Sequence, residues 1–158
     1  MALIGFMGSG KSTLGPLLAE CLEVPFCDLD QVIEEREGGA IPDLFKAGGE
    51  SGFRAAEKAA LEVCLESDAM VLACGGGTPC QPGLMDRLLA WGEVIYLEVP
   101  FEELQKRGLA DRPLWSEGAS QLLEKRRGVY ERAPIRLDGT LPPEQLVQAA
   151  VNCLEFRR

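Results

Sequence analysis

Short apolar segments alternate along this chain with longer segments of helical periodicity. Three of these segments, 2–6, 69–73 and 94–97, are almost wholly apolar, which is typical of strands buried on both faces of a parallel sheet. Two shorter segments, 25–27 and 134–137, predict further strands. Helices are expected over 13–22, 31–37, 42–46, 50–66, 82–90, 100–107, 119–132 and 143–156. This alternation predicts an α/β fold with a parallel sheet.

Glycine and proline residues mark where several of these elements begin and end. Gly38-Gly39 and Gly48-Gly49 follow predicted helices, and Pro42 suits the first turn of another. Segment 108–118 has no clear period and is expected to be irregular. No internal repeat, low-complexity tract or linker divides the sequence, so residues 1–158 are predicted to form a single domain.

The first apolar segment leads directly into the most informative motif of the chain. Residues 5–13, Gly-Phe-Met-Gly-Ser-Gly-Lys-Ser-Thr, match the phosphate-binding loop G-x-x-x-x-G-K-[ST]. Its glycines let backbone N–H groups point at a phosphate, Lys11 reaches the β- and γ-phosphates, and Ser12 ligates Mg²⁺. A glycine-rich turn could match by chance, but the strand before it and the helix after it favour nucleotide binding. The predicted ATP-binding residues are Gly8, Ser9, Gly10, Lys11, Ser12 and Thr13.

Composition narrows the class of protein and its partners. The chain has 158 residues, of which 46% are hydrophobic and 26% charged, as in an ordinary soluble globular protein. Its net charge of −9 argues against nucleic acid as a partner. An acidic protein that binds ATP must gather its cations locally, so arginines near the predicted loops are candidate ligand-binding residues.

Six cysteines occur without a C-x-x-C pair, and the chain has no histidine to complete a zinc site. They are therefore expected to be free, buried thiols in a reducing compartment. The N-terminus lacks the basic region of a signal peptide, and no apolar run approaches the length of a membrane span. These features predict a cytoplasmic protein.

Asp28 and Asp30 follow the second predicted strand, at the sheet edge where ligands bind in parallel sheets. One carboxylate can face Mg²⁺ while the other orients or deprotonates an acceptor hydroxyl, as phosphoryl transfer requires. The alternative is that Asp30 simply caps the helix that follows.

Arg54, near the start of its helix, suits a bidentate contact with an acceptor carboxylate, with Glu57 one turn on to orient it. A solvated ion pair is the alternative. Gly75-Gly76-Gly77 after the third strand lets backbone N–H groups approach a ligand, unless it is only a tight turn.

Two further arginine-bearing segments can supply cations. A lid over about 107–117 would place Arg112 on the transferring phosphoryl group, and Arg107 could stack on a purine. A bare surface loop is the alternative. In the run Lys125-Arg126-Arg127 one residue could turn inward toward an anionic acceptor, although a charge run is usually a solvated face.

Taken together in this order, the residues resemble the shikimate kinase family. The resemblance includes residues 5–13, Asp28 and Asp30, Phe53-Arg54 with Glu57, the triple glycine, Arg112-Pro113-Leu114, and Arg126 four residues before Tyr130. It implies a nucleoside-monophosphate-kinase-like fold: a P-loop three-layer α/β/α sandwich with a five-stranded parallel sheet. It also implies transfer of the ATP γ-phosphate to the 3-hydroxyl of shikimate, a step of aromatic amino-acid biosynthesis. Nothing in the sequence suggests more than a monomer.

The resemblance also assigns roles to individual residues. Lys11 would hold phosphates, Ser12 would ligate Mg²⁺, and Asp28 would assist the metal through water. Asp30 would contact the acceptor hydroxyls and serve as base, and Arg112 would be the lid arginine on the γ-phosphate. The shikimate-binding residues would be Asp30, Arg54, Gly75, Gly76, Gly77 and Arg126. Arg107 would be a candidate for adenine stacking.

Three other functions compete with this interpretation. Another small-molecule kinase of the same fold, such as a gluconate kinase, is expected to lack the Phe-Arg helix start together with the triple glycine. A nucleotide-binding switch would need a metal site but no carboxylate aimed at an acceptor oxygen. A nucleotide hydrolase would release ADP with no acceptor present.

Overall fold

Five parallel strands form one sheet in the order β2-β3-β1-β4-β5. The computed structural model describes residues 1–67, 69–107 and 118–156. The strands are β1 (Ala2–Ile4), β2 (Phe26–Asp28), β3 (Val71–Ala73), β4 (Val94–Glu98) and β5 (Ile135–Asp138). The predicted α/β fold with a five-stranded parallel sheet is confirmed.

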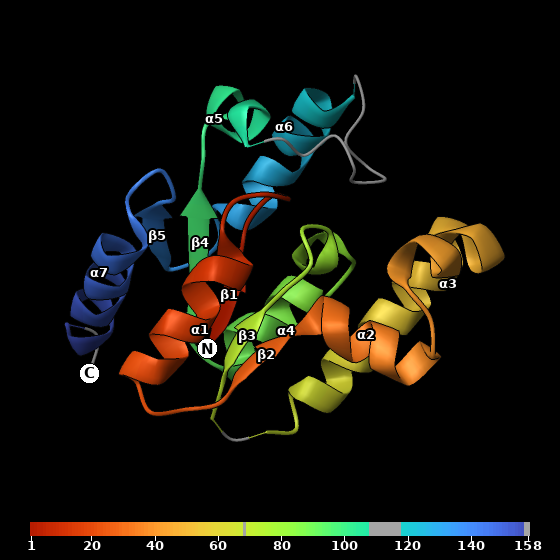
Figure 1. Ribbon diagram of the computed structural model, residues 1–158, viewed down its shortest axis with the longest axis horizontal. Coiled ribbons are helices and arrows are strands. Elements are labelled where there is room, and N and C mark those ends of the chain that lie inside the picture. The colour runs from red at the N-terminus through yellow and green to blue at the C-terminus, as the bar shows by residue number, and fades with distance from the viewer. Residues whose placement is uncertain (68, 108–117, 157–158) are drawn as a thin grey trace.

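Side chains of the central strand alternate between two hydrophobic cores, one on each face of the sheet. Leu3 packs with residues of α1 (Lys11–Cys21) and α7 (Pro143–Glu155), while Ala2 and Ile4 pack on the opposite face. That second core includes residues of α3 (Ile41–Cys64), α4 (Leu84–Trp91) and α6 (Ala119–Tyr130). Figure 1 shows the sheet between these two groups of helices, so the molecule has three layers.

The remaining helices are α2 (Leu29–Glu37), the 3₁₀ turn η1 (Thr78–Cys80) and α5 (Phe101–Lys106). Figure 1 shows α2 beside the N-terminal part of α3, at one side of the sheet. Gly49, with φ 63° and ψ −170°, interrupts α3, as the Gly48-Gly49 break between two predicted helices indicated. Within the described residues, no helix combines the length and the apolar character needed to cross a membrane.

Several predicted boundaries differ from the observed ones by one or two residues, and one of these differences bears on the candidate site. Helix α2 starts at Leu29 rather than at residue 31, because the side chain of Asp28 caps it by accepting a hydrogen bond from Asp30 N at 3.0 Å. The alternative role of Asp30 as the helix cap is therefore wrong: Asp28 is the cap, and Asp30 lies in the first turn.

All six cysteines are free, as expected, but they are not uniformly buried. Cys64 and Cys74 are buried, Cys21 is exposed, and the other three are half-buried. The expectation of burial was therefore wrong for Cys21, whose position near the end of α1 faces away from the sheet.

Parallel strands bring three loops to one edge of the sheet. The phosphate loop follows β1, Asp28 ends β2, and Gly75-Gly76-Gly77 follows β3. Because β2, β3 and β1 are neighbours and parallel, their carboxyl ends lie side by side. The fold thus gathers candidate residues that lie as far apart in the sequence as Gly5 and Gly77.

Candidate active site

The phosphate loop curls around the ammonium group of Lys11. Lys11 Nζ donates to Gly5 O at 2.9 Å and to Phe6 O at 3.0 Å, and the side chain is buried. Gly8 and Gly10 have φ of 78° and 104°, a region that favours glycine. Gly10 is also the N-cap of α1, so the positive end of that helix faces the loop. The loop therefore has the geometry of an anion-binding site.

Ser12 and Asp28 bring a hydroxyl and a carboxylate together beside this loop. Ser12 Oγ donates to Asp28 Oδ2 at 2.7 Å, while Asp28 Oδ1 caps α2. Hard oxygen ligands of this kind suit Mg²⁺, which takes one or two protein ligands and completes its shell with water and phosphate oxygens. The described residues contain no cluster of three or more His, Cys, Asp or Glu that would hold a metal alone. The pair fits a metal that arrives with a nucleotide.

Two adjoining cavities open at this edge of the sheet. The phosphate cavity, of about 260 Å³, is lined by the phosphate loop, Asp28, Asp30, Arg107 and residues 73–76. The arginine cavity, of about 310 Å³, extends from there toward α2 and the N-terminal part of α3. Residues that line both are Met7, Asp28, Asp30, Gly75 and Gly76. Ligands in the two cavities would therefore meet at the carboxylate of Asp30.

Charges of both signs line the arginine cavity. The cations are Arg54 and Arg126, and the carboxylates are Asp28, Asp30, Glu34 and Glu57. Phe45 and Phe53, with ring centroids 4.5 Å apart, contribute to its apolar wall together with Met7 and Ile41. The cavity therefore suits a small ligand with an apolar body, an anionic group and hydroxyl groups.

Buried Glu57 holds Arg54 in place. Glu57 is 1% exposed, and Arg54 Nη1 donates to Glu57 Oε2 at 2.6 Å. Thr78 Oγ1 and Gln81 Nε2 also donate to this carboxylate, each at 2.6 Å. The alternative of a solvated ion pair is wrong, since a carboxylate buried among three donors orients the guanidinium at the cavity wall.

The triple glycine leaves room for these charged side chains. A Cβ on Gly77 would lie 2.6 Å from Arg54 Nη1, and one on Gly75 would lie 2.7 Å from Glu57 Oε1. A Cβ on Gly76 would approach Met7 N of the phosphate loop to 3.2 Å. The glycines therefore form more than a tight turn: they let Arg54, Glu57 and the phosphate loop pack directly on their backbone.

The adjacent arginines of α6 have different environments. Arg126 is 8% exposed, lines the arginine cavity and places its guanidinium 5.9 Å from the Phe6 ring centroid. The Arg127 side chain is 45% exposed and pairs with Glu124 at 2.6 Å on the surface. Between the two, only Arg126 is positioned to meet a ligand in the cavity.

Arg107 joins the phosphate loop to a segment that the sequence analysis missed. Arg107 Nη1 donates to Gly8 O at 2.8 Å, and Nη2 donates to Gly139 O at 2.7 Å. Gly139 N in turn donates to Glu98 O at 2.8 Å, which holds residues 138–140 beside the loop. The available signal was an Asp-Gly turn directly after the last strand, at the ligand-binding edge. Arg112 and the rest of the expected lid, 108–117, lie outside the described residues.

A buried thiol also lines the phosphate cavity. Burial raises the pKa of Cys74 to about 12, against the opposing effect of the positive charge on Lys11. The thiol therefore stays neutral at physiological pH and is not a nucleophile. The reactive groups at this edge of the sheet are the oxygen ligands.

Comparison with known proteins gives one consistent result. The sequence profile of a family described as shikimate kinase matches residues 7–155. The chain is 36% identical over 160 residues to the shikimate kinase of Aquifex aeolicus, covering 97% of this chain and 94% of that protein. It is 44% identical over 140 residues to the enzyme of Persephonella marina, covering 85% of each. A structure of the Acinetobacter baumannii enzyme in complex with shikimate superposes with a TM-score of 0.91 at 33% identity, covering 99% of this chain and 93% of that one.

Proposed function

The chain belongs to the shikimate kinase family, and from this membership we propose how its residues divide the family's reaction between them. In that reaction the γ-phosphoryl group of ATP is transferred to the 3-hydroxyl of shikimate, giving shikimate 3-phosphate and ADP. The observation that carries the proposal is the shared wall of the two cavities, where Asp30 reaches both. A nucleotide in one cavity and an acceptor in the other would bring the reacting atoms together there.

The phosphate cavity takes the triphosphate of ATP. Backbone N–H groups of the loop and the ammonium of Lys11 bind the phosphate oxygens, with Thr13 at the start of α1. Arg107 and residues 138–140 lie beside the loop and are the proposed neighbours of the nucleoside. Ser12 and Asp28 would hold Mg²⁺, which supplies charge neutralisation of the phosphates when bound.

The arginine cavity takes shikimate in one orientation. Its carboxylate pairs with Arg54 and Arg126, because a guanidinium fork matches a carboxylate in charge and geometry. Asp30 and Glu34 repel that carboxylate and favour the hydroxyl groups near them. Backbone N–H groups of Gly75, Gly76 or Gly77 are the proposed donors to a hydroxyl oxygen.

At the shared wall, Asp30 accepts a hydrogen bond from the attacking hydroxyl and so aims its oxygen at the phosphorus. As the new O–P bond forms, the bond between the γ-phosphorus and the bridging oxygen of ADP breaks, and the hydroxyl proton passes to this carboxylate or to the product phosphate. Since phosphoryl transfer is loose and little is needed from a base, most of the acceleration comes from position and charge. Arg112 is the proposed lid cation on the transferring group, as the family resemblance implies.

We further propose that residues 1–158 act as one domain, as a monomer and in the cytoplasm. ATP is abundant there, and free thiols are stable in a reducing compartment. The acidic net charge of −9 makes nucleic acid an unsuitable partner.

ADP release tests the function directly. The purified protein is given ATP and Mg²⁺ with shikimate, gluconate, a nucleoside monophosphate or no acceptor. Shikimate-dependent turnover that disappears when Mg²⁺ is chelated is expected. Steady ADP release without acceptor would indicate a hydrolase, a gluconate preference would indicate the related sugar-acid kinase, and ATP binding without turnover would indicate a switch.

A further inference from the structure

We propose that Tyr130 is a positioning residue that ties Arg126 to Gly76, and so holds the two proposed contacts of shikimate at a set separation. The inference rests on the proposed function, because it concerns how the acceptor is held for the same transfer. It assigns to Tyr130 a role in the affinity for shikimate, distinct from the binding of ATP.

The first half of the link is a buried hydrogen bond between distant segments. Tyr130 is fully buried, and its hydroxyl donates to Gly76 O at 2.5 Å across 54 residues of sequence. Gly76 packs on its other side against the phosphate loop, where a Cβ would lie 3.2 Å from Met7 N and 3.5 Å from Gly5 O. The central peptide of the triple glycine is therefore held between the phenol and the loop.

The second half of the link is local to α6. Arg126 lies one helical turn before Tyr130, so the two side chains share a face of the helix. Burial raises the pKa of the Tyr130 phenol, and the positive charge of Arg126 opposes that rise. The phenol thus lies on the same helix face as the proposed carboxylate clamp, Arg126, while it donates to the Gly76 carbonyl, which lines the same cavity.

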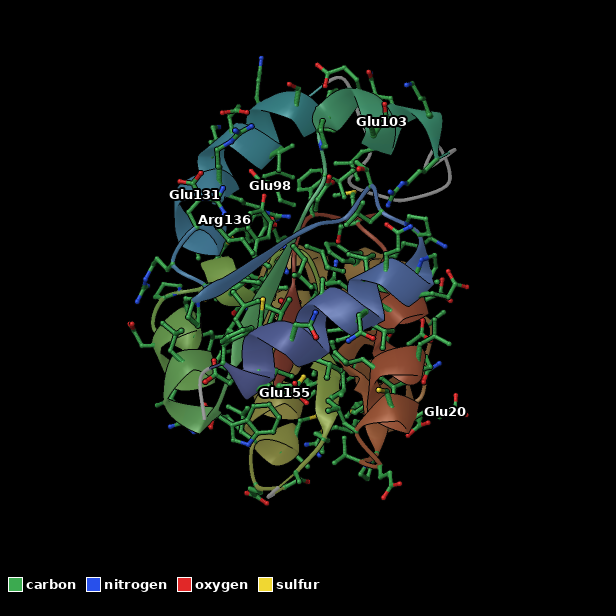
Figure 2. All side chains as sticks on the ribbon, turned by 90° about the vertical axis from the view of Figure 1, so that its left-hand side faces the viewer. Glu20, Glu98, Glu103, Glu131, Arg136 and Glu155 are labelled. Carbon is green, nitrogen blue, oxygen red and sulfur yellow. The ribbon has the colours of Figure 1, made fainter. Side chains whose placement is uncertain are left out.

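The ring of Tyr96 packs against the Tyr130 side chain. The Tyr96 ring of β4 lies 5.2 Å from it at an interplanar angle of 30°. Arg136 covers the Tyr96 ring at 5.9 Å and pairs with Glu98 at 2.9 Å and with Glu131 at 3.6 Å. Figure 2 shows these three charged residues grouped near α6 on the face turned to the viewer. Because the ring is fixed from outside, its hydroxyl can serve as a reference point for Gly76 and Arg126.

Loss of the hydroxyl would loosen both contacts at once. Without it, Gly76 O loses a donor inside the protein, and the Arg126 guanidinium loses a neighbour that limits its rotamers. The nucleotide side is less affected, because Lys11 and Arg107 are held by carbonyl groups of residues 5, 6, 8 and 139.

Steady-state kinetics of Tyr130→Phe test this role, with Tyr96→Phe as the matched control. Each variant removes one phenol oxygen from the same pair of neighbouring rings, but only the first breaks the bond to Gly76. We expect the KM for shikimate to rise about fivefold or more in Tyr130→Phe. The KM for ATP should stay within about twofold, and Tyr96→Phe should leave both values unchanged. A lower kcat with both KM values unaltered would show a merely structural role and overturn the proposal.

A second measurement does not depend on the folding of that variant. The chain has only two tyrosines, so 3-fluorotyrosine incorporated into Tyr96→Phe reports on position 130 alone. Its ¹⁹F signal should shift when shikimate is added and stay in place when ATP is added by itself. A ¹⁹F signal that does not shift when shikimate is added would overturn the inference. If the unaltered protein shows no shikimate-dependent ADP release, the proposed function fails instead, and the two failures are distinguishable.

Discussion

Asp30 is the residue on which the chemistry of the site converges, because it lines both cavities beside Gly75 and Gly76. Its Oδ1 would lie 3.2 Å from a Cβ on Gly75, so the carboxylate is aimed at the triple glycine. Its neighbour Asp28 is occupied by Ser12 and by the cap of α2. The two carboxylates, one residue apart, therefore serve different ends of the reaction.

We expect Asp30→Asn to lower kcat by about 100-fold or more, since the amide cannot accept the proton and is a weaker partner for the hydroxyl. Affinity for ATP, measured by calorimetry, should be unchanged because the phosphate loop is untouched. Near-normal turnover would remove Asp30 from the chemistry.

A substitution in the triple glycine tests whether Gly77 is needed to seat Arg54. Gly77→Ala places a methyl group about where the Arg54 guanidinium now packs, 2.6 Å from both of its terminal nitrogens. Arg54 must swing away, so the KM for shikimate should rise roughly tenfold or more, the loss expected for a charge-assisted contact.

Gly52→Ala is the matched control for that substitution. Gly52 lies in α3, where a Cβ would meet nothing within 4 Å. Its kinetics should equal those of the unaltered protein. An equal rise in KM for both variants would mean that Gly77 is not needed to seat Arg54.

At the scale of elements, α3 combines two helices with different tasks. Its N-terminal part carries Phe45 at the arginine cavity, and its C-terminal part carries Arg54 and Glu57 and packs on the sheet. The break at Gly49 allows the first part to turn over the cavity while the second stays in the core. The position of the cavity wall therefore depends on one backbone conformation.

Gly49→Ala should destabilise the protein by about 1–3 kcal/mol, because φ 63° with ψ −170° is a conformation that residues with a Cβ rarely adopt. Gly48→Ala, next to it in the helix and with nothing within 4 Å of its Cβ, should be neutral or slightly stabilising. Urea unfolding of both variants measures the difference. Equal free energies of unfolding for the two variants would show that a side chain at position 49 does not strain the kink.

At the scale of the whole molecule, several buried acids should make the fold sensitive to alkaline pH. Burial raises the pKa of Cys74 and that of Tyr96 to about 12 each, from 9.0 and 10.0, and raises that of Tyr130 as well. Well below pH 9 these groups are neutral in the folded and in the unfolded protein, and their contribution to stability is fully present. As pH rises toward 12 the unfolded chain loses their protons first, so stability falls.

We expect the free energy of unfolding, measured in urea with a reductant present, to fall by a few kcal/mol between pH 8 and pH 11.5. Cys74→Ala should reduce the steepness of this fall. Cys21→Ala, which removes an exposed thiol, should leave it unchanged. If both variants keep the original slope, ionisation of Cys74 is not coupled to unfolding.

The sequence by itself determined the features that depend on neighbouring residues. Apolar runs and helical periodicity are local, so they predicted the alternation of strands and helices and the break at Gly48-Gly49. The phosphate loop is also a continuous motif, and the structure gives its glycines positive φ. Ligands bind at the carboxyl ends of parallel strands, and this rule predicted from the sequence alone that Asp28, Asp30 and the triple glycine lie together.

Only the tertiary structure decided which side chains meet, because that depends on contacts between segments far apart in the chain. It assigned the cap of α2 to Asp28 and turned Arg126, not Arg127, toward the cavity. It also brought the 138–140 loop to Arg107. A glycine inside a helix looks unfavourable in sequence, yet Gly15 is needed because a Cβ there would lie 2.2 Å from the Phe26 ring. Periodicity shows that a face is buried, whereas close packing alone determines what that face touches.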